Sequence, residues 1–463
     1  MPEPRHTKVL ILGGGMGGYV AALRAAQLGL EALLIEGDRL GGTCLIRGCI
    51  PSKALIHAAD RFAEIGAATA LGVSVGAPSL DLAKTVAWKD GVVDRLNNGV
   101  AGLLARAKVP VFEGWATFSD AKTCTIESTS GPVTLTAEHV ILAAGSEAVS
   151  LPGFPFGGDV ISSTEALSLS RLPRSLAVVG AGYIGLELGI AFRKLGAAVT
   201  VVETAERILP RYDAALSRPV RRWLDRNKVI LHLGAKAVGR DPEGRLTVET
   251  ANGDRIAVEV DKILVTVGRR PRTAGWGLEN MGVDMAGPFV MVDEQCRTAM
   301  KNVWAVGDLV GEPMLAHKAA AQGAMVAEII AGHRRRFDPA MVAAVCFTEP
   351  EIVSTGLAPD EAKAVGEDVV TGQFPFSASG RALTLEAADE GGFVRVVARR
   401  ADGRVLGIQA VGRGVAELAG EFAHALAMGA VLDDIAGTIH VHPTLGEAFG
   451  EAALAALGRS LHI

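Results

Sequence analysis

An internal repeat constrains the fold of this chain more than any other feature of its sequence. A short apolar run precedes GGGMGG at 13–18, and another precedes GAGYIG at 180–185. In each copy an amphipathic stretch follows and ends in Leu-Gly, and a second apolar run then ends at an acid. One constant offset relates the two sets of residues, which are Gly13, Gly29 and Glu36 in the first copy and Gly180, Gly196 and Glu203 in the second. A chance match of three features in register is improbable, so we expect the two segments to fold alike.

Each copy predicts a strand, a glycine turn, a helix and a second strand that ends at the acid, which is the βαβ unit of a dinucleotide-binding domain. The first glycine permits the tight turn, the second lets the backbone approach a pyrophosphate, and the third packs the helix against the strand. These glycines are Gly13, Gly15 and Gly18 in the first unit, and Gly180, Gly182 and Gly185 in the second. The pyrophosphate lies at the helix N-terminus, where free N–H groups favour negative charge. A single motif of this kind would leave a packing role open, but two complete units in register favour nucleotide binding.

The acid of the second unit indicates which nicotinamide nucleotide binds there. The Glu203 carboxylate can accept hydrogen bonds from a ribose diol but repels a 2′-phosphate. No arginine follows it immediately, and Arg207 stands a few residues further on. The sequence therefore predicts NAD rather than NADP.

The length of the chain predicts several domains, because a single core rarely grows beyond ~250–300 residues, and this chain has 463. Further apolar runs end at Gly145, Gly268 and Gly307, and a Pro/Gly cluster at 151–155 is typical of a domain crossing. Short strands predicted at 393–398 and 405–411 indicate a different C-terminal pattern. We predict an α/β fold with two Rossmann-like dinucleotide-binding domains and a C-terminal α+β domain. The expected ranges are 1–150, 151–270, a central domain at 271–340 that completes the first cofactor site, and 341–463.

Composition gives little reason to expect a nucleic acid or membrane partner. The formal net charge is −5, which favours neither nucleic acid nor an anionic membrane. No apolar run reaches the ~18 residues of a membrane span. The apolar stretch near the N-terminus is interrupted by glycines, and no small-residue cleavage site follows it convincingly. We expect a soluble, cytoplasmic protein.

The cysteines point to one place for thiol chemistry. There are five, which is few and odd in number, so a secreted disulfide scaffold is not expected. Cys44 and Cys49 lie close together in GGTCLIRGCIPSK at 41–53, before a helix expected to open near Pro51. A helix N-terminus lowers the pKa of a nearby thiol, and the thiolate is the reactive form.

Other roles for these two cysteines are less favoured. A structural disulfide across so short a loop would contribute only on the order of 2 kcal/mol. A metal site needs further ligands at compatible spacing, and there is no second cysteine pair, so we predict no metal. The pattern favours a redox-active pair, with inert core thiols as the remaining alternative.

The segment HVHPTLGE at 440–447 contains a candidate base. His442 precedes a proline and a helix expected to begin around Thr444. Thr444 and Glu447 match a Thr-x-x-Glu capping box, which by itself explains both residues. Alternatively, Glu447 orients His442 and stabilises its protonated form, and a histidine suits deprotonation of a thiol at neutral pH. His440 has no comparable context and is expected to be structural.

Five motifs together carry a resemblance to a known family over essentially the whole chain. They are GGTCLIRGCIPSK, GAGYIGLE, VGRRPRT, WAVGDLVGEPMLAHKA and HVHPTLGE. The chain resembles the pyridine nucleotide–disulfide oxidoreductases and, within them, the dihydrolipoyl dehydrogenases. It is most similar to the form that serves branched-chain 2-oxo acid dehydrogenase complexes.

The resemblance implies FAD in the first unit and NAD in the second. Lys53 would lie near flavin N5 and pair with Glu187, although from sequence alone these two are surface residues on helices. Tyr183 would act as a gate over the flavin, with ordinary packing in the first helical turn as the alternative. The further residues implied for FAD are Glu36, Ala116, Ala144, Gly145, Ser146, Asp308, Met314, Leu315, Ala316 and His317. Those implied for NAD are Glu203, Ala237 and Gly268 together with the glycines of the second turn.

The resemblance also implies a reaction and partners. Protein-bound dihydrolipoamide would be oxidised through Cys44, Cys49 and FAD, and NAD⁺ would be reduced. The chain would form a homodimer through its C-terminal domain, with His442 acting in the other subunit's site. A lipoyl-bearing acyltransferase subunit of a 2-oxo acid dehydrogenase complex would be the larger partner.

Rival activities fit the sequence less well. Glutathione-type reductases prefer NADP, against which Glu203 argues. Mercuric reductases typically end in a cysteine pair, whereas this chain ends in Ser-Leu-His-Ile. A nucleotide-sensing or scaffolding protein without turnover would not need the cysteine pair, His442 and Glu447 together.

Overall fold

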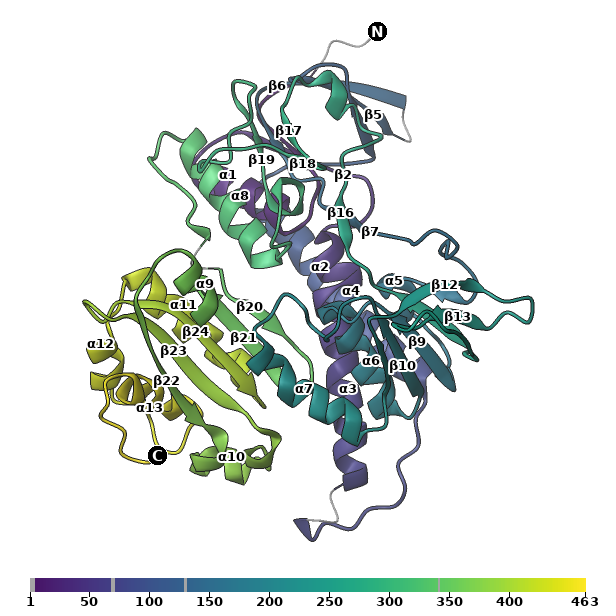
Figure 1. Cartoon of the computed structure of the whole chain (residues 1–463). Coiled ribbons are helices and arrows are strands. Elements are labelled where there is room, and N and C mark those ends of the chain that lie inside the picture. The colour runs from purple at the N-terminus through teal and green to yellow at the C-terminus, as the bar shows by residue number, and fades with distance from the viewer. Residues whose placement is uncertain (1–4, 68–70, 129–130, 340–341) are drawn as a thin grey trace.

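The computed structural model describes residues 5–67, 71–128, 131–339 and 342–463, arranged around three main sheets (Figure 1). The first sheet runs in the order β3 (Val111–Glu113), β2 (Ala32–Glu36), β1 (Arg5–Leu12), β6 (Gly131–Leu142), β5 (Thr123–Ser128) and β4 (Trp115–Phe118), and β19 (Val303–Ala305) also pairs with β6. Its helices are α1 (Met16–Gln27), α2 (Gly42–Arg47), α3 (Cys49–Ala67), α4 (Leu82–Arg106) and α8 (Ala316–Ile330). Because β19 joins this sheet and α8 packs on α1, the predicted central segment builds part of the first unit.

The second sheet is built around the other copy of the repeat. Its order is β11 (Ile230–Leu233), β10 (Ala198–Glu203), β9 (Ser175–Val179), β15 (Lys262–Val265) and β8 (Val160–Ile161). The helices of this part are α5 (Ser163–Ala166), α6 (Tyr183–Leu195) and α7 (Ala214–Arg226). A smaller antiparallel sheet follows, made of β12 (Lys236–Arg240), β13 (Leu246–Glu249) and β14 (Arg255–Val258). β7 (Ser146–Ala148) pairs with β16 (Arg269–Pro271) where the chain enters and leaves this part.

The two repeated units have the same local geometry. β1 pairs with β2 and β9 with β10 in parallel, as the repeat predicts. Gly13 and Gly180 have φ of 97° and 101°, a region that favours glycine, and a Cβ on either would lie within 2.7 Å of a neighbouring carbonyl oxygen. Glu36 accepts hydrogen bonds from the N–H groups of Gly14 and Asp38. Glu203 accepts the matching pair from Ala181 and Ala205, so both acids brace their glycine turns.

The C-terminal part is an antiparallel sheet covered by helices. Its order is β20 (Ala344–Cys346), β21 (Glu351–Gly356), β24 (Val405–Gly412), β23 (Phe393–Arg399) and β22 (Val369–Pro375). The helices are α9 (Pro359–Ala364), α10 (Gly380–Thr384), α11 (Ala419–Met428), α12 (Leu432–Gly437) and α13 (Glu447–Ala456). Phe422 and Phe449 meet edge-to-face, 5.0 Å apart, in its core. Asp213, the cap of α7, accepts a hydrogen bond from Arg395, which ties this sheet to the second unit.

The predicted fold class is confirmed, and two predicted helix starts are corrected. α3 begins at Cys49 rather than near Pro51, and α13 begins at Glu447 rather than around Thr444. The predicted domain limits stay a prediction, and the limit at 340 and 341 lies outside the described residues. Across the described ranges, none of the helices is long and apolar enough to pass through a membrane.

Candidate active site

Cys44 and Cys49 form a disulfide at the junction of two helices. Cys44 lies in the first turn of α2, Cys49 is the first residue of α3, and their Cα atoms are 4.6 Å apart. Both line a deep pocket, here called the cysteine pocket, which also reaches the glycine turn of the first unit and Glu36. A dithiol–disulfide couple therefore shares one pocket with a dinucleotide cradle.

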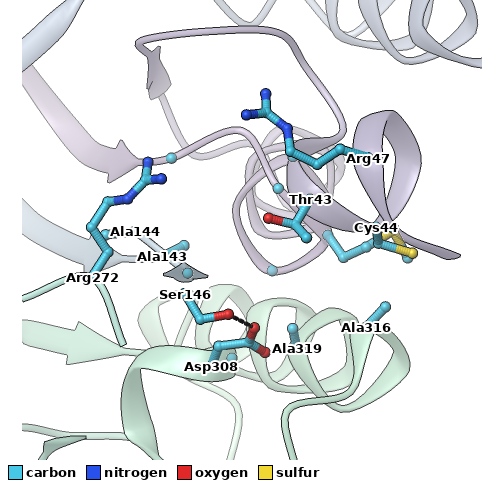
Figure 2. Close-up of a pocket in the computed structure, with 18 of the residues that line it drawn as sticks. Thr43, Cys44, Arg47, Ala143, Ala144, Ser146, Arg272, Asp308, Ala316 and Ala319 are labelled. Atoms are coloured by element: carbon cyan, nitrogen blue, oxygen red, sulfur yellow. Dashed lines mark hydrogen bonds between the residues drawn. The ribbon is translucent and has the colours of Figure 1, made fainter. Parts of the chain in front are cut away.

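Most of the residues predicted for FAD line this pocket. They are Gly13, Gly15, Glu36, Lys53, Ala116, Ala144, Gly145, Ser146, Asp308, Met314 and Ala316. Three predicted residues are not among its described lining: Gly18, Leu315, which caps α8, and His317, whose Nε2 lies 2.8 Å from the Ala343 carbonyl oxygen. Gly18 packs α1 against its turn, as predicted for the third glycine of the motif, because a Cβ there would lie 1.8 Å from the Gly13 carbonyl oxygen. Figure 2 shows Cys44 and Arg272 on opposite sides of the pocket.

The shape and donors of the pocket fit a dinucleotide. No side chain caps the N-terminus of α1, and its N-cap Gly15 borders the pocket with only Gly42 near the position of a Cβ. The free N–H groups there suit a pyrophosphate. Below them the Ser146 hydroxyl donates a hydrogen bond to Asp308, at 2.5 Å (Figure 2). Asp308, the uncapped N-terminus of α1 and the Cys44–Cys49 disulfide are the elements that FAD would contact.

A partly buried ion pair lines the cysteine pocket together with the disulfide. The Lys53 ammonium donates to Glu187 at 2.8 Å, and Glu187 is almost fully buried. The second Glu187 oxygen accepts from the Phe347 N–H, and Lys53 Nζ lies 4.4 Å from the centre of the Phe347 ring. From the residues alone, Lys53 and Glu187 were expected on helix surfaces, and only the family resemblance implied that they pair. The structure brings them together at the cysteine pocket.

Sequence reasoning missed several arginines of the site, above all Arg269. Its guanidinium donates to the Ser146 hydroxyl and to the Ser146 carbonyl oxygen, both at 2.8 Å. Burial lowers the pKa of Arg269, which Asp308 and Tyr183 partly oppose. The signal was present in VGRRPRT, since Arg269 directly follows a glycine that was singled out. Arg47 and Arg272 also line the cysteine pocket.

A second pocket, here called the Glu203 pocket, lies at the glycine turn of the second unit. Its lining contains the residues predicted for NAD: Gly180, Gly182, Tyr183, Glu203, Ala237 and Gly268. Gly185 is not in this lining and packs α6 against its turn, as predicted for the third glycine of the motif, because a Cβ there would lie 2.3 Å from the Gly180 carbonyl oxygen. Tyr183, Ile184, Arg269 and Met314 line both pockets. Tyr183 therefore stands where the pockets meet, and burial next to Glu187 raises its pKa to about 12.

The remaining cysteines are separate from this chemistry. Cys124, Cys296 and Cys346 are buried free thiols. Burial raises the pKa of Cys124 and of Cys296 to about 12, and it also raises that of Cys346. Since the thiolate is the reactive form, these groups are held inert at neutral pH.

His442 and Glu447 are paired, as one of the two sequence interpretations expected. His442 Nδ1 lies 2.8 Å from Glu447, and the second Glu447 oxygen accepts from the Thr444 N–H. Burial alone would raise the pKa of Glu447, but the hydrogen bonds from His442 and Thr444 outweigh it and lower the pKa. Half of the predicted capping box forms: Glu447 accepts the Thr444 N–H, but the Thr444 hydroxyl donates to the Val441 carbonyl oxygen, and Thr444 lies outside α13.

The position of His442 differs from that of its neighbour. The His442 side chain is 79% exposed, and His442 is absent from the described lining of its own chain's cysteine pocket. His440 is largely buried and lies 3.1 Å from both Glu421 and the Thr438 carbonyl oxygen, as expected for a structural residue.

Comparison with known proteins agrees with this geometry. The chain matches the profile "Pyridine nucleotide-disulphide oxidoreductase" over residues 7–323 and that family's "dimerisation domain" over residues 342–453. It is 57% identical to a dihydrolipoyl dehydrogenase from Pseudomonas aeruginosa over 100% of both chains. It is 42% identical to one from Geobacillus stearothermophilus over 99% of this chain and 98% of that one.

A solved structure is similar over nearly the whole chain. The crystal structure of LpdA from Mycobacterium tuberculosis superposes with a TM-score of 0.89 at 28% identity, covering 96% of this chain and 99% of that one. The family's cofactors, FAD and NAD, are the two that the sequence predicts. The chain belongs to the pyridine nucleotide–disulphide oxidoreductases.

Proposed function

We propose that this chain is a dihydrolipoyl dehydrogenase, which oxidises protein-bound dihydrolipoamide to lipoamide and reduces NAD⁺ to NADH. One observation carries the proposal: the Cys44–Cys49 disulfide lines the same pocket as a dinucleotide cradle, and that pocket shares Tyr183 and Met314 with the Glu203 pocket. Bound FAD would supply the redox centre between the dithiol and the nicotinamide.

The cysteines perform the exchange with the substrate. A thiolate of dihydrolipoamide attacks Sγ of Cys44, and the bond between the two cysteine sulfurs breaks with its electron pair on Cys49. The second substrate thiolate then attacks the substrate sulfur bound to Cys44, which closes the lipoamide ring and releases Cys44. The substrate is oxidised by two electrons, and the enzyme holds them as the reduced Cys44–Cys49 pair.

His442 is the proposed base for the substrate thiols. The Glu447 carboxylate fixes its Nδ1 side, which leaves Nε2 to accept the proton. Because His442 is exposed and away from its own chain's pocket, it would act in the site of a second subunit. Ile439 and Val441 beside it are 95% and 72% exposed, so they give a partner subunit apolar surface to cover next to His442. Together with the match to the dimerisation domain, this supports a homodimer in which each site needs both chains.

The proposed substrate also indicates the multienzyme complex in which the enzyme acts. A lipoyl group on an acyltransferase subunit of a 2-oxo acid dehydrogenase complex would reach the disulfide, and the sequence favours the branched-chain form. Three buried, unpaired cysteines fit a reducing compartment, so we place the enzyme in the cytoplasm.

NAD⁺ reduction by dihydrolipoamide tests the proposal, with NADP⁺ and reduced glutathione as alternative reactants. We expect NADH formation from dihydrolipoamide with NAD⁺. Turnover should be much slower when NADP⁺ replaces NAD⁺ or when glutathione replaces dihydrolipoamide. Activity with glutathione but none with dihydrolipoamide would contradict the substrate assignment.

A further inference from the structure

An ion pair in the lining of the Glu203 pocket joins two loops that are distant in sequence. Arg211 Nη1 lies 3.1 Å from Oε1 of Glu312, and both residues line the pocket. Arg211 lies between β10 and α7 of the second unit, whereas Glu312 precedes α8 of the first unit. Their side chains are 77% and 47% exposed, so the pair lies at the solvent side of the pocket.

The loop that carries Arg211 is held in place. Arg207 donates to the carbonyl oxygens of Pro210 and Tyr212, each at 2.6 Å. Leu209 adopts φ of 48°, a region that a leucine rarely enters, and its carbonyl oxygen accepts from the Tyr212 N–H. Arg211 therefore projects from a braced turn, and its long side chain is the part that can move.

The loop that carries Glu312 lies where the two pockets join. Glu312 accepts a hydrogen bond from the N–H of Met314, at 3.2 Å, and Met314 lines both pockets. A nucleotide whose nicotinamide end reaches toward the cysteine pocket must pass this loop. Arg211 and Glu312 are thus placed along its route.

Charge decides how the pair acts on a bound dinucleotide. The diphosphate carries two negative charges, which attract a guanidinium and repel a carboxylate. The other charged lining residues are Glu203, Lys236 and Arg269, and Arg269 already donates to Ser146. Among the described residues, Arg211 forms an ion pair only with Glu312, at the solvent side of the pocket.

We propose that Arg211 binds the negatively charged nicotinamide dinucleotide and that Glu312 competes for the same guanidinium, so the pair sets the affinity for NAD. The inference rests on the proposed function for the identity of the nucleotide. It assigns opposite effects to the two members of one ion pair, which a purely structural bridge would not produce.

The test compares Arg211→Gln, Glu312→Gln and the double variant in the FAD-loaded enzyme. The Kd for NAD⁺ is measured by titration calorimetry, and the KM for NAD⁺ is measured alongside. We expect Arg211→Gln to weaken binding about two- to fivefold and Glu312→Gln to tighten it by a similar factor, the range for exposed charges. The double variant should lie between them, and the salt dependence of Kd should shrink in Arg211→Gln.

A matched control is Arg221→Gln, which breaks an exposed ion pair with Asp225 on α7 of the same part of the chain, outside the pocket lining. Its Kd should equal that of the wild type. Shifts in the same direction for Arg211→Gln and Glu312→Gln, or no shift in either, would overturn the proposal. Flavin reduction by dihydrolipoamide in the wild type is measured separately, because its failure would refute the dithiol assignment while the calorimetry still decides the role of Arg211.

Discussion

Nζ of Lys53 lies 2.8 Å from Oε2 of Glu187, and this contact joins the helix that begins at Cys49 to the helix of the second glycine turn. Glu187 is almost fully buried and also accepts the Phe347 N–H from the C-terminal part. Three segments that are distant in sequence therefore converge on one carboxylate beside the disulfide.

Replacing Glu187 with Gln should impair both stability and the reductive half-reaction. The Lys53 ammonium, whose side chain is 33% exposed, would lose its charged partner, which costs on the order of 1 kcal/mol. We expect a lower unfolding temperature and at least tenfold slower flavin reduction by dihydrolipoamide, checked by thermal scans and stopped-flow absorbance. Asp360→Asn is the control, because it removes the carboxylate of an exposed pair with Lys363. A Glu187→Gln enzyme that matches this control in both measurements would refute a role for the pair.

His442→Gln should slow dihydrolipoamide oxidation by roughly 10²–10⁴, the usual contribution of a positioned base. The chain offers a close control in His462, an exposed histidine whose Nδ1 lies 2.7 Å from Glu451. Steady-state kinetics of His442→Gln and His462→Gln should show a loss of dihydrolipoamide oxidation for His442→Gln alone. Rates within tenfold of wild type would remove His442 from the scheme.

Glu203→Gln should relax the preference for NAD over NADP. Glutamine can still accept a hydrogen bond from the Ala181 N–H but no longer repels a 2′-phosphate. We expect the ratio of kcat/KM for NAD⁺ to that for NADP⁺ to fall by roughly tenfold. Glu36→Gln alters the matching acid of the first unit and should leave this ratio unchanged, whatever it does to flavin retention. An unchanged ratio in Glu203→Gln would show that another residue sets the preference.

The stability of the enzyme should depend on the ionisation of Glu390. Burial, and then the charge of Glu349, raise its pKa from 4.5 to about 7, although Arg413, Lys194 and Arg226 oppose this. The folded state thus keeps a proton up to about pH 7 that the unfolded chain releases near 4.5, so stability falls as pH rises through this window. Its Oε2 has no hydrogen-bond partner among the described residues, which fits a neutral acid.

Glu390→Gln, which mimics the neutral acid, should therefore be more thermostable relative to wild type at pH 8 than at pH 5. Unfolding temperatures across this range test the prediction. Asp389→Asn, an exposed neighbour in the same turn, should show no such trend. A difference between Glu390→Gln and wild type that does not vary with pH would be inconsistent with the assigned ionisation.

The repeat, the redox cysteines and the histidine–glutamate pair could be predicted because each is a pattern of residues that are close together in the sequence. Glycine spacing, apolar runs and turn acids all act within about thirty residues, so their pattern survives without tertiary information. The predicted starts of α3 and α13 are less accurate, because Pro51 and Pro443 indicate a nearby helix start without fixing the residue at which the first turn begins.

Long-range relationships lay beyond local pattern. Lys53 and Glu187 are 134 residues apart, and residue-level reasoning placed both on surfaces. The contacts of Arg269 and of the Arg211–Glu312 pair exist only in the folded chain, because they depend on where β16 and the loop before α8 lie. The resemblance implies that His317 contacts FAD, which stays a prediction, and the contact of its ring with the Ala343 carbonyl oxygen was not visible in the sequence.

The most direct test of the central claim compares wild type with Cys49→Ser in dihydrolipoamide-dependent NAD⁺ reduction, after both have been shown to hold FAD by their visible absorbance. If electron pairs pass through the Cys44–Cys49 disulfide, the variant should remain yellow while its turnover falls to background. A flavin-loaded Cys49→Ser enzyme that reduces NAD⁺ at the wild-type rate would contradict the account.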